Sequence, residues 1–247
     1  MTVAHVVRLS AARLLTAPVV PARWRSPVLA GAAASVLAFG LLTGQVLEKG
    51  RALRVNVVFD EPIQRRLNGH QHLLEVARAF GSRDALVVGL CVLVVGSLLL
   101  RRGRTAVVVL LTLPGAGALT ERVLKPLVTM SAPINSHPGY PSGHATGAAA
   151  LATTVLLLLL PQAPSAGRQI GRGLLRVVTG VVVVTLAAGT AVAVVALDTH
   201  NAASALGGGL VACSVVLIVA LGLDAACSVA SSRTSVEVDR ERQLSRR

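Results

Sequence analysis

The sequence predicts an all-α polytopic membrane protein, a bundle of six transmembrane helices with an amphipathic helix in its first outer loop. Three observations support this class. Apolar residues make up 53% of the 247 positions, only 14% are charged, and the mean hydropathy is +0.69. Because soluble domains carry about 25% charged residues, this composition argues against an ordinary soluble enzyme, a disordered chain or a DNA-binding domain.

Six apolar runs supply the predicted spans, since a helix needs about 20 mostly apolar residues to cross a bilayer. The second, third and fourth runs are short, so their spans must include flanking polar residues. Glu48 and Lys49 follow the first run without a small-residue cleavage site, which indicates a retained span rather than a signal peptide. The runs are 28–47, 85–100, 105–119, 145–160, 177–197 and 205–223.

The placement of basic residues predicts the orientation. With the N-terminus inside, the inner segments hold +11 of the formal net charge of +13. We therefore expect a plasma (inner) membrane protein with both termini cytoplasmic: an N-terminal segment 1–26, a transmembrane domain 27–223 and a polar tail 224–247. The excess of basic residues is explained by their position on the cytoplasmic side of the membrane, and aromatic residues make up only 2% of the chain. We therefore expect no nucleic-acid partner.

The first outer loop, residues 48–84, contains a further helix signal. Asp60 can cap a helix with Pro62 in its first turn, and Gly81 follows its end. Two placements suit this amphipathic helix: on the outer leaflet, or packed over the bundle as a cap. The apolar positions at helical spacing are Phe59, Ile63, Leu67, Leu74, Ala77 and Phe80.

The most specific segment is GYPSGHATG, residues 139–147, at the outer start of the fourth run. A helix start exposes unpaired N–H groups that suit an anion, and Pro141 fits that position. Gly143 allows close backbone approach, Ser142 offers a hydroxyl, and His144 titrates near neutral pH. The pattern predicts a phosphate-binding corner with a proton donor; the alternative is a turn that happens to carry a histidine.

A second polar group, residues 198–201, lies between the fifth and sixth runs, on the same predicted side as His144. His200, beside a helix start, is biased toward the neutral, nucleophilic form. Asp198 or Thr199 is expected to cap the sixth helix. The alternative role for His200 is that of a polar residue at the membrane interface.

A third group ends the third run on that same side. Lys125 is a candidate phosphate cation, although Glu121 lies four residues earlier and the two can simply pair. His137 lies in the loop before the GYPSGHATG segment, and we do not expect it to be catalytic. No Cys-x-x-Cys spacing indicates a metal or redox centre, so neither metal nor cofactor is expected.

The order of Lys125, the Pro-Ser-Gly-His sequence ending at His144, and His200 resembles the type 2 phosphatidic acid phosphatase (PAP2) superfamily, which includes bacterial polyprenyl diphosphate phosphatases. The resemblance covers roughly residues 48–223. It implies six spans, an outward-facing site and a metal-free reaction. His200 would be the nucleophile that forms a phosphohistidine and His144 the general acid. Lys125, Ser142 and Gly143 would bind the phosphoryl oxygens.

Two of the three signature parts depart from the family pattern, although Lys125, Pro133 and His200 are kept. Because phosphoryl transfer depends on cations that clamp the equatorial oxygens, these changes predict an impaired site unless other groups substitute. The departing positions are Ala132 and Val194 where the family has arginines, Ala193 where it has serine, and Ser204 where it has aspartate.

Three residues are candidate substitutes. Arg122, about one turn before Lys125, offers a second cation. Ser204 shares a helix face with His200 and can orient its imidazole, whereas Asp198 can do so only if the chain there is not helical.

Three functions compete. The first is a membrane phosphatase that hydrolyses a lipid phosphomonoester or diphosphate, of the phosphatidate or polyprenyl diphosphate class, at the outer membrane face. Its partners are then the lipid substrate and the bilayer. The second is a catalytically impaired relative that binds lipid phosphate or plays a structural role. A transporter is disfavoured because the ionisable residues lie at span ends rather than within spans.

Overall fold

The computed structural model describes residues 17–49, 53–131, 139–161 and 169–244, and the regular elements in these segments are all helical. The all-α prediction is therefore confirmed. One helix lies over each predicted apolar run, although the last residue of three runs, at positions 100, 160 and 197, falls just outside its helix. These helices are α2 (Arg25–Lys49), α5 (Arg83–Leu99), α6 (Gly103–Leu119), α8 (Gly143–Leu159), α9 (Gln169–Ala196) and α10 (Ala202–Leu244).

Four helices in the described segments are long and apolar enough to cross a membrane. They are α2, α9, α10 and the continuous helix over residues 103–128, which begins as α6. A fifth candidate joins α5 to the preceding helix across a 44° bend. α8 has 17 residues, about 25 Å at 1.5 Å per residue, and is shorter than the others. The chain is an integral membrane protein, and its sixth span stays a prediction.

Two helices, α3 (Arg54–Leu67) and α4 (Gln71–Ala79), replace the single amphipathic helix predicted between the first two spans. They separate at Gly69, whose φ of 103° is a left-handed conformation that glycine adopts without strain. The predicted start at Asp60 is wrong, because Leu53 is the N-cap and Asp60 lies inside α3. The predicted end is right, because α4 ends just before Gly81.

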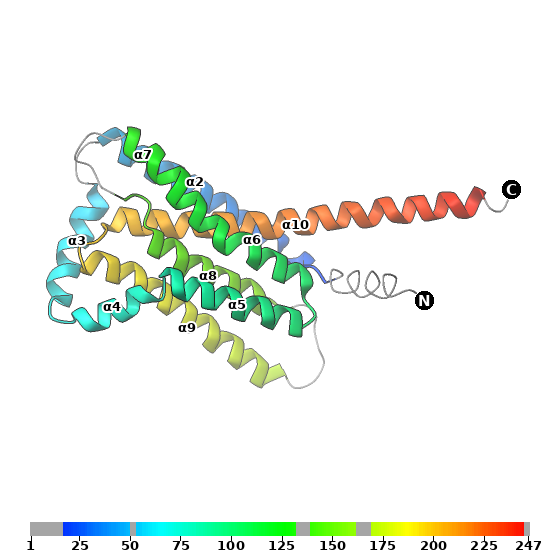
Figure 1. The fold of residues 1–247 in the computed structure, drawn as a ribbon, viewed down its shortest axis with the longest axis horizontal. Helices are drawn as coiled ribbons and strands as arrows, with labels where there is room; N and C mark the ends of the chain where they lie inside the picture. Colours follow the sequence, from blue (N-terminus) through cyan, green and yellow to red (C-terminus); the bar gives the residue numbers. More distant parts are fainter. Residues whose placement is uncertain (1–16, 50–52, 132–138, 162–168, 245–247) are drawn as a thin grey trace.

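α3 and α4 cover the end of the bundle opposite the end from which α10 projects (Figure 1). α3 packs against α9 and α10, and α4 packs against α9. The side chains of Val57, Val58 and Phe59 on α3 are nevertheless more than half exposed. The pair thus caps the bundle and also presents an apolar edge; its placement on the outer leaflet stays a prediction.

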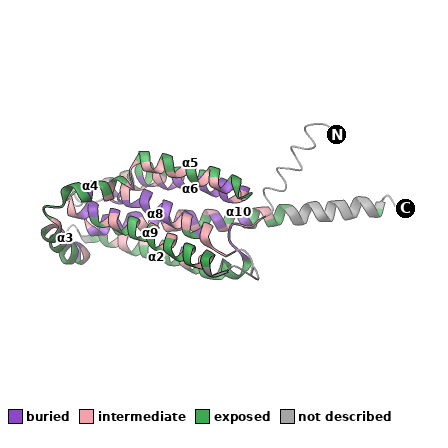
Figure 2. Cartoon of the chain, turned by 90° about the horizontal axis from the view of Figure 1, so that it is seen from below, coloured by how far each residue is buried: buried purple, intermediate pink, exposed green. Residues whose placement is uncertain are grey.

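α8 is the central helix. It packs against α5, α6, α9 and α10, and Figure 2 shows its buried residues enclosed by the other helices. Small side chains such as Ala148, Ala150 and Thr146 are fully buried there and let the helices approach closely. The apolar side chains of α2 and α9 remain largely exposed, Leu41 and Leu175 among them, as lipid-facing surfaces require.

Asp224 fastens the other end of the bundle. Its buried carboxylate accepts hydrogen bonds from the amides of Val19 and Val20 at 2.9 and 2.8 Å and contacts Arg104 Nη1 at 3.4 Å. The segment before α2 is thereby tied to α10 and α6. α10 runs on to Leu244, so the predicted tail, residues 224–247, begins as a continuation of the last helix.

Candidate functional site

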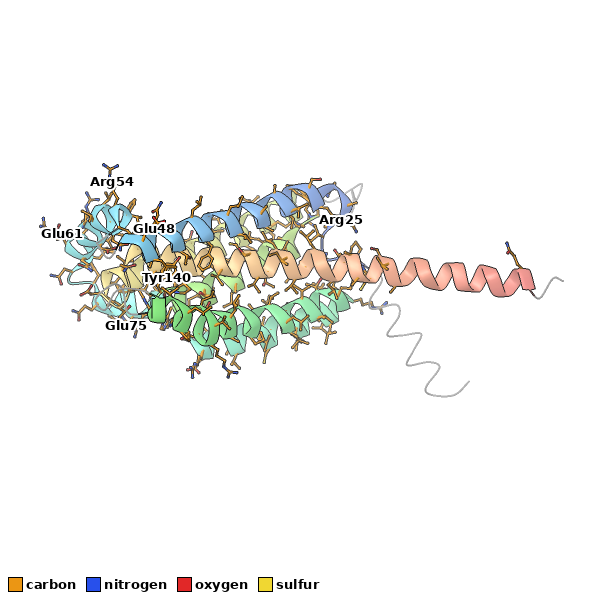
Figure 3. All side chains as sticks on the ribbon, turned by 90° about the horizontal axis from the view of Figure 1, so that it is seen from above. Arg25, Glu48, Arg54, Glu61, Glu75 and Tyr140 are labelled. Carbon is orange, nitrogen blue, oxygen red and sulfur yellow. The ribbon has the colours of Figure 1, made fainter. Side chains whose placement is uncertain are left out.

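The candidate site residues gather at the α3 and α4 end of the bundle, where α8 and α10 begin. In Figure 3, Tyr140 lies at this end with Glu48, Arg54 and Glu75, whereas Arg25 marks the opposite end. Tyr140 belongs to the GYPSGHATG segment, so the most specific motif of the sequence is found here. The sequence prediction that the polar groups share one side of the protein agrees with this arrangement.

Ser142 caps the start of α8. Its Oγ accepts from the amide of Ala145 at 3.4 Å, and its carbonyl accepts from the amide of Thr146 at 3.0 Å. The amides of Gly143 and His144 stand first in the helix, where no intrahelical acceptor exists. They are therefore the two backbone donors that this corner can offer to an anion.

The corner is held rigidly from two sides. The buried Tyr140 forms a hydrogen bond with Thr43 at 2.9 Å and stacks on Phe39 with ring centroids 6.1 Å apart. On the α10 side, Gly208 allows close backbone approach, since a Cβ there would lie 2.4 Å from the carbonyl oxygen of Ser142. The start of α8 is thus fixed against both α2 and α10.

His200 lies in the turn before α10, and its imidazole contacts Ser204. Nδ1 is 3.3 Å from Ser204 Oγ, which donates its own proton to the Gly139 carbonyl at 3.2 Å. Since a hydroxyl has one proton, a Ser204 Oγ that donates to Gly139 can accept from His200 Nδ1–H. This tautomer leaves the lone pair on Nε2 available for attack.

The electrostatics keep His200 neutral. Burial, followed by the positive charges of Lys125 and His144, lowers its pKa to about 4. His200 precedes the sixth apolar run and so lies outside the predicted span. At neutral pH the imidazole is an uncharged base, the form that a nucleophile requires.

Asp198 and Thr199, the expected caps of α10, point elsewhere, and this prediction is wrong. Asp198 has a left-handed φ of 53° and accepts from Gln64 Nε2 at 3.0 Å. The Thr199 hydroxyl donates to the Val194 carbonyl at 2.9 Å. Ser204, rather than Asp198, is therefore the group that touches the His200 ring.

The caps of α10 come from α3 and from Asn201. Asp60 Oδ1, Asn56 Oδ1 and Asn201 Oδ1 accept from the successive amides of residues 202–204 at 2.8, 2.9 and 2.8 Å. Two of these three acceptors are more than 140 positions away in sequence. α3 thereby fixes the helix start that carries His200 and Ser204, a role that sequence reasoning missed.

Lys125 begins α7 (Lys125–Ser131), directly after the π-helical segment η2 (Thr120–Leu124). Its Nζ lies 2.7 and 2.8 Å from the two carboxylate oxygens of Glu121. The pair sits against the start of α8, because a Cβ on Gly143 would lie 2.2 Å from Glu121 Oε1 and 3.8 Å from Lys125 Nζ. Arg122, which directly follows Glu121, is exposed. No described contact joins it to the pair of Lys125 and Glu121.

Arg78 on α4 is a second cation beside the site that the sequence analysis did not identify. His144, which precedes the fourth apolar run, has its pKa lowered first by burial and then by the charges of Arg78 and Lys125. Arg78 Nη2 pairs with Glu75 at 2.6 Å. The turn after α4 lies against the start of α8, since a Cβ on Gly81 would be 2.2 Å from the His144 carbonyl oxygen.

Val194 occupies one of the positions where the family pattern has an arginine, and it lies in an apolar environment. Val194 and the adjacent Ala193 are fully buried, and Val194 packs with Ala145 of α8 and Ala202 of α10. The Val194 carbonyl still accepts from the amide of His200 at 3.0 Å, so its backbone holds the turn. Three further positions of the sequence analysis, Ala132, Pro133 and His137, lie outside the described residues.

Comparisons with known proteins agree with this fold. Residues 118–226 match the family model of the PAP2 superfamily. The structure is similar to the crystal structure of the first transmembrane PAP2-type phosphatidylglycerolphosphate phosphatase from Bacillus subtilis, with a TM-score of 0.58. The sequence identity is 17%, and the match covers 78% of this chain and 95% of that chain. At this identity the likeness concerns the fold alone. A comparison with curated proteins gave no match.

Proposed function

We propose that this chain is a member of the PAP2 superfamily and that it is a membrane lipid-phosphate phosphatase that acts at the outer face of the plasma membrane. Its substrate is a lipid phosphomonoester or diphosphate, of the phosphatidate or polyprenyl diphosphate class. The observation that carries the proposal is the hydrogen-bond chain from His200 Nδ1 through Ser204 to the Gly139 carbonyl. It presents Nε2 of a neutral imidazole beside an anion-binding helix start.

The reaction has two displacements. In the first, His200 Nε2 forms a bond to phosphorus while the bond from phosphorus to the leaving oxygen breaks, and His144 gives a proton to that oxygen. Burial and the nearby cations disfavour the protonated imidazole, whereas the negative charge of the bound phosphate favours it. In the second, water attacks the phosphohistidine, His144 takes a proton from the water, and Nε2 is released with inorganic phosphate. Splitting the reaction in this way replaces one hard step by two easier ones.

The phosphoryl oxygens are bound by the amides of Gly143 and His144 and by the cations Lys125 and Arg78. Arg78 takes the role that the sequence analysis assigned to Arg122, because its charge acts on His144 and Arg122 has no described contact with the site. Preorganised cations and amides contribute most of the rate in phosphoryl transfer. Replacement of the family arginines by Val194 and Ala132 therefore predicts a slower enzyme rather than an inactive one.

The second candidate is a PAP2-fold protein that binds lipid phosphate without turning it over. The fully buried Val194 and the uncharged Ser204 favour it, since an imidazole partnered by a hydroxyl gains less stabilisation of positive charge than one partnered by a carboxylate. The two candidates share the binding corner and differ only in the fate of the bound phosphate.

Phosphate release from phosphatidate and from a polyprenyl diphosphate, measured with the chain purified in detergent micelles, separates the two. We expect release by the wild type, its loss in His200→Ala and His144→Ala, and no change in the control His72→Ala, an exposed histidine on α4. Equal release by the wild type and His200→Ala would contradict the phosphohistidine mechanism. Binding of both lipids without release would favour the second candidate.

A further inference from the structure

Arginines gather around the end of α8 that lies opposite the candidate site. Arg102 Nη1 donates to the Leu158 carbonyl at 2.9 Å. Arg23, in the short helix η1 (Ala22–Trp24), donates from Nη2 to the Pro161 carbonyl at 2.7 Å. The last carbonyls of a helix attract cations in this way. A guanidinium has five N–H donors, so both arginines keep donors for a further acceptor.

A third arginine adds its charge to these two. Burial, followed by the positive charge of Arg176 on α9, lowers the pKa of Arg102. Arg102 lies in the turn between α5 and α6, outside the candidate spans. A half-buried guanidinium beside another cation is disfavoured unless an anion compensates the charge. We call Arg23, Arg102 and Arg176 the arginine cluster.

The structure describes no ion pair between the arginine cluster and an acid of the chain. Asp224 lies at this end, but its carboxylate is used by Arg104 and by two backbone amides. The next acid, Glu237, is on the projecting part of α10, about 20 Å further along the helix at 1.5 Å per residue. The stretches that contain the cluster have no Asp or Glu: 1–47, 85–120 and 122–197. We therefore expect the compensating anion to come from outside the chain.

Apolar surface adjoins the arginine cluster on two helices. α5 and α9 both pack on α8 (Figure 1). Each presents exposed apolar side chains next to a cluster arginine: Leu98, Leu99 and Leu100 before Arg102, and Leu174, Leu175 and Val177 around Arg176. A ligand that fits this surface has a negative headgroup for the arginines and long apolar chains for the faces of α5 and α9.

We propose that the arginine cluster binds the phosphate of an anionic phospholipid whose acyl chains lie along α5 and α9. In the predicted orientation this lipid belongs to the inner leaflet, away from the candidate site. Arginine suits the role because its planar guanidinium donates two parallel hydrogen bonds to phosphate oxygens. The headgroup of a zwitterionic lipid carries its own cation, so an anionic lipid neutralises the cluster better. The bound lipid would link η1, the turn between α5 and α6, and α9 around the end of α8.

Lipid retention by the full chain, purified in an uncharged detergent, tests this site. Native mass spectrometry at increasing concentrations of dioleoylphosphatidylglycerol or dioleoylphosphatidylcholine gives an apparent Kd for each lipid. We expect the wild type to bind phosphatidylglycerol more tightly. Arg102→Gln should weaken that binding by about fivefold, the contribution of one basic residue near an anionic membrane surface, and leave phosphatidylcholine binding unchanged.

Arg25→Gln is the matched control. Arg25 is an exposed arginine at the same end of the protein (Figure 3), and the structure describes no contact between its side chain and α8. The Kd for phosphatidylglycerol should not change in this variant. If Arg102→Gln fails to fold, Arg176→Gln removes a cluster charge without removing a described hydrogen bond, and it should weaken the binding to a similar degree.

Equal Kd values of the wild type for the two lipids would overturn the proposal. An equal loss in Arg25→Gln would also do so, because it would mark a diffuse surface charge rather than a site. Unchanged phosphatidylglycerol binding in the folded Arg102 or Arg176 variant would place the lipid elsewhere, the candidate catalytic site included. Glycerophosphoglycerol, the headgroup without acyl chains, provides the last arm: if it displaces the lipid at equimolar concentration, the site recognises a phosphate and not a lipid.

Discussion

Replacing Ser204 tests the part of the site that differs most from the family pattern. Ser204→Ala removes the acceptor of His200 Nδ1–H, 3.3 Å away, and the donor to the Gly139 carbonyl at 3.2 Å. A neutral hydrogen bond contributes about 0.5–1.5 kcal/mol net. If this energy orients the ring in the transition state, kcat/KM should fall by about 2- to 12-fold.

The pH profile gives a second measure of the same contact. Neutral His200 is the nucleophile, and its protonated form, which predominates below the pKa, cannot attack. With a pKa of about 4, the acid limb that His200 contributes to kcat/KM should appear near pH 4 and leave the neutral range unaffected. Ser204→Asp should raise this pKa, because a carboxylate stabilises the imidazolium, and move that limb toward neutral pH.

The assay is phosphate release from phosphatidate in detergent micelles, measured between pH 4 and pH 9. Ser214→Ala is the control, since Ser214 is a buried serine on the same helix whose hydroxyl donates to the Leu210 carbonyl. The reasoning is refuted if Ser204→Ala keeps wild-type kcat/KM, or if Ser204→Asp leaves the acid limb where the wild type has it.

Three further predictions concern the elements around the site. Arg78→Ala should lower kcat/KM on the order of tenfold in the same assay. This is less than the 10²–10³ loss for a fully preorganised donor, because the Arg78 side chain is 32% exposed and is paired with Glu75. An equal loss of kcat/KM in Arg83→Ala would argue against a specific role for Arg78. Asp60→Ala should cost about 1 kcal/mol as a lost cap, seen in thermal unfolding, and Asp60→Asn should restore most of it because an acceptor for the α10 start remains. Asp224→Ala should cost about 3–5 kcal/mol by breaking a buried charge pair, lowering the Tm without altering the activity of folded molecules; a wild-type Tm would contradict this.

The sequence predicted the features that short-range patterns determine. Apolar runs located the six long helices, and the Pro-Ser-Gly-His sequence located the start of α8. The four-residue spacings also gave two contacts that the structure contains: Ser204 with His200, and Lys125 with Glu121.

What the sequence could not predict depends on contacts between distant segments. The α10 cap by Asn56 joins residues 147 positions apart, and no local pattern encodes such a pair. Arg78 resembled any other cation on an amphipathic helix until the fold placed α4 beside His144. The break at Gly69 was also missed, because one glycine within a helical pattern does not by itself end a helix.

The departures from the family pattern compensate one another electrostatically. The cations Lys125 and Arg78 are balanced by Glu121 and Glu75, so an aspartate in place of Ser204 would leave this group with a net negative charge. Ser204→Asp alone should therefore orient His200 better while repelling the phosphate, which predicts a raised KM even where kcat improves. A cation added near the site would have to accompany the aspartate. The uncharged Ser204 is in this sense the partner that a site with few arginines requires, since it keeps the imidazole in place without weakening the attraction for the substrate.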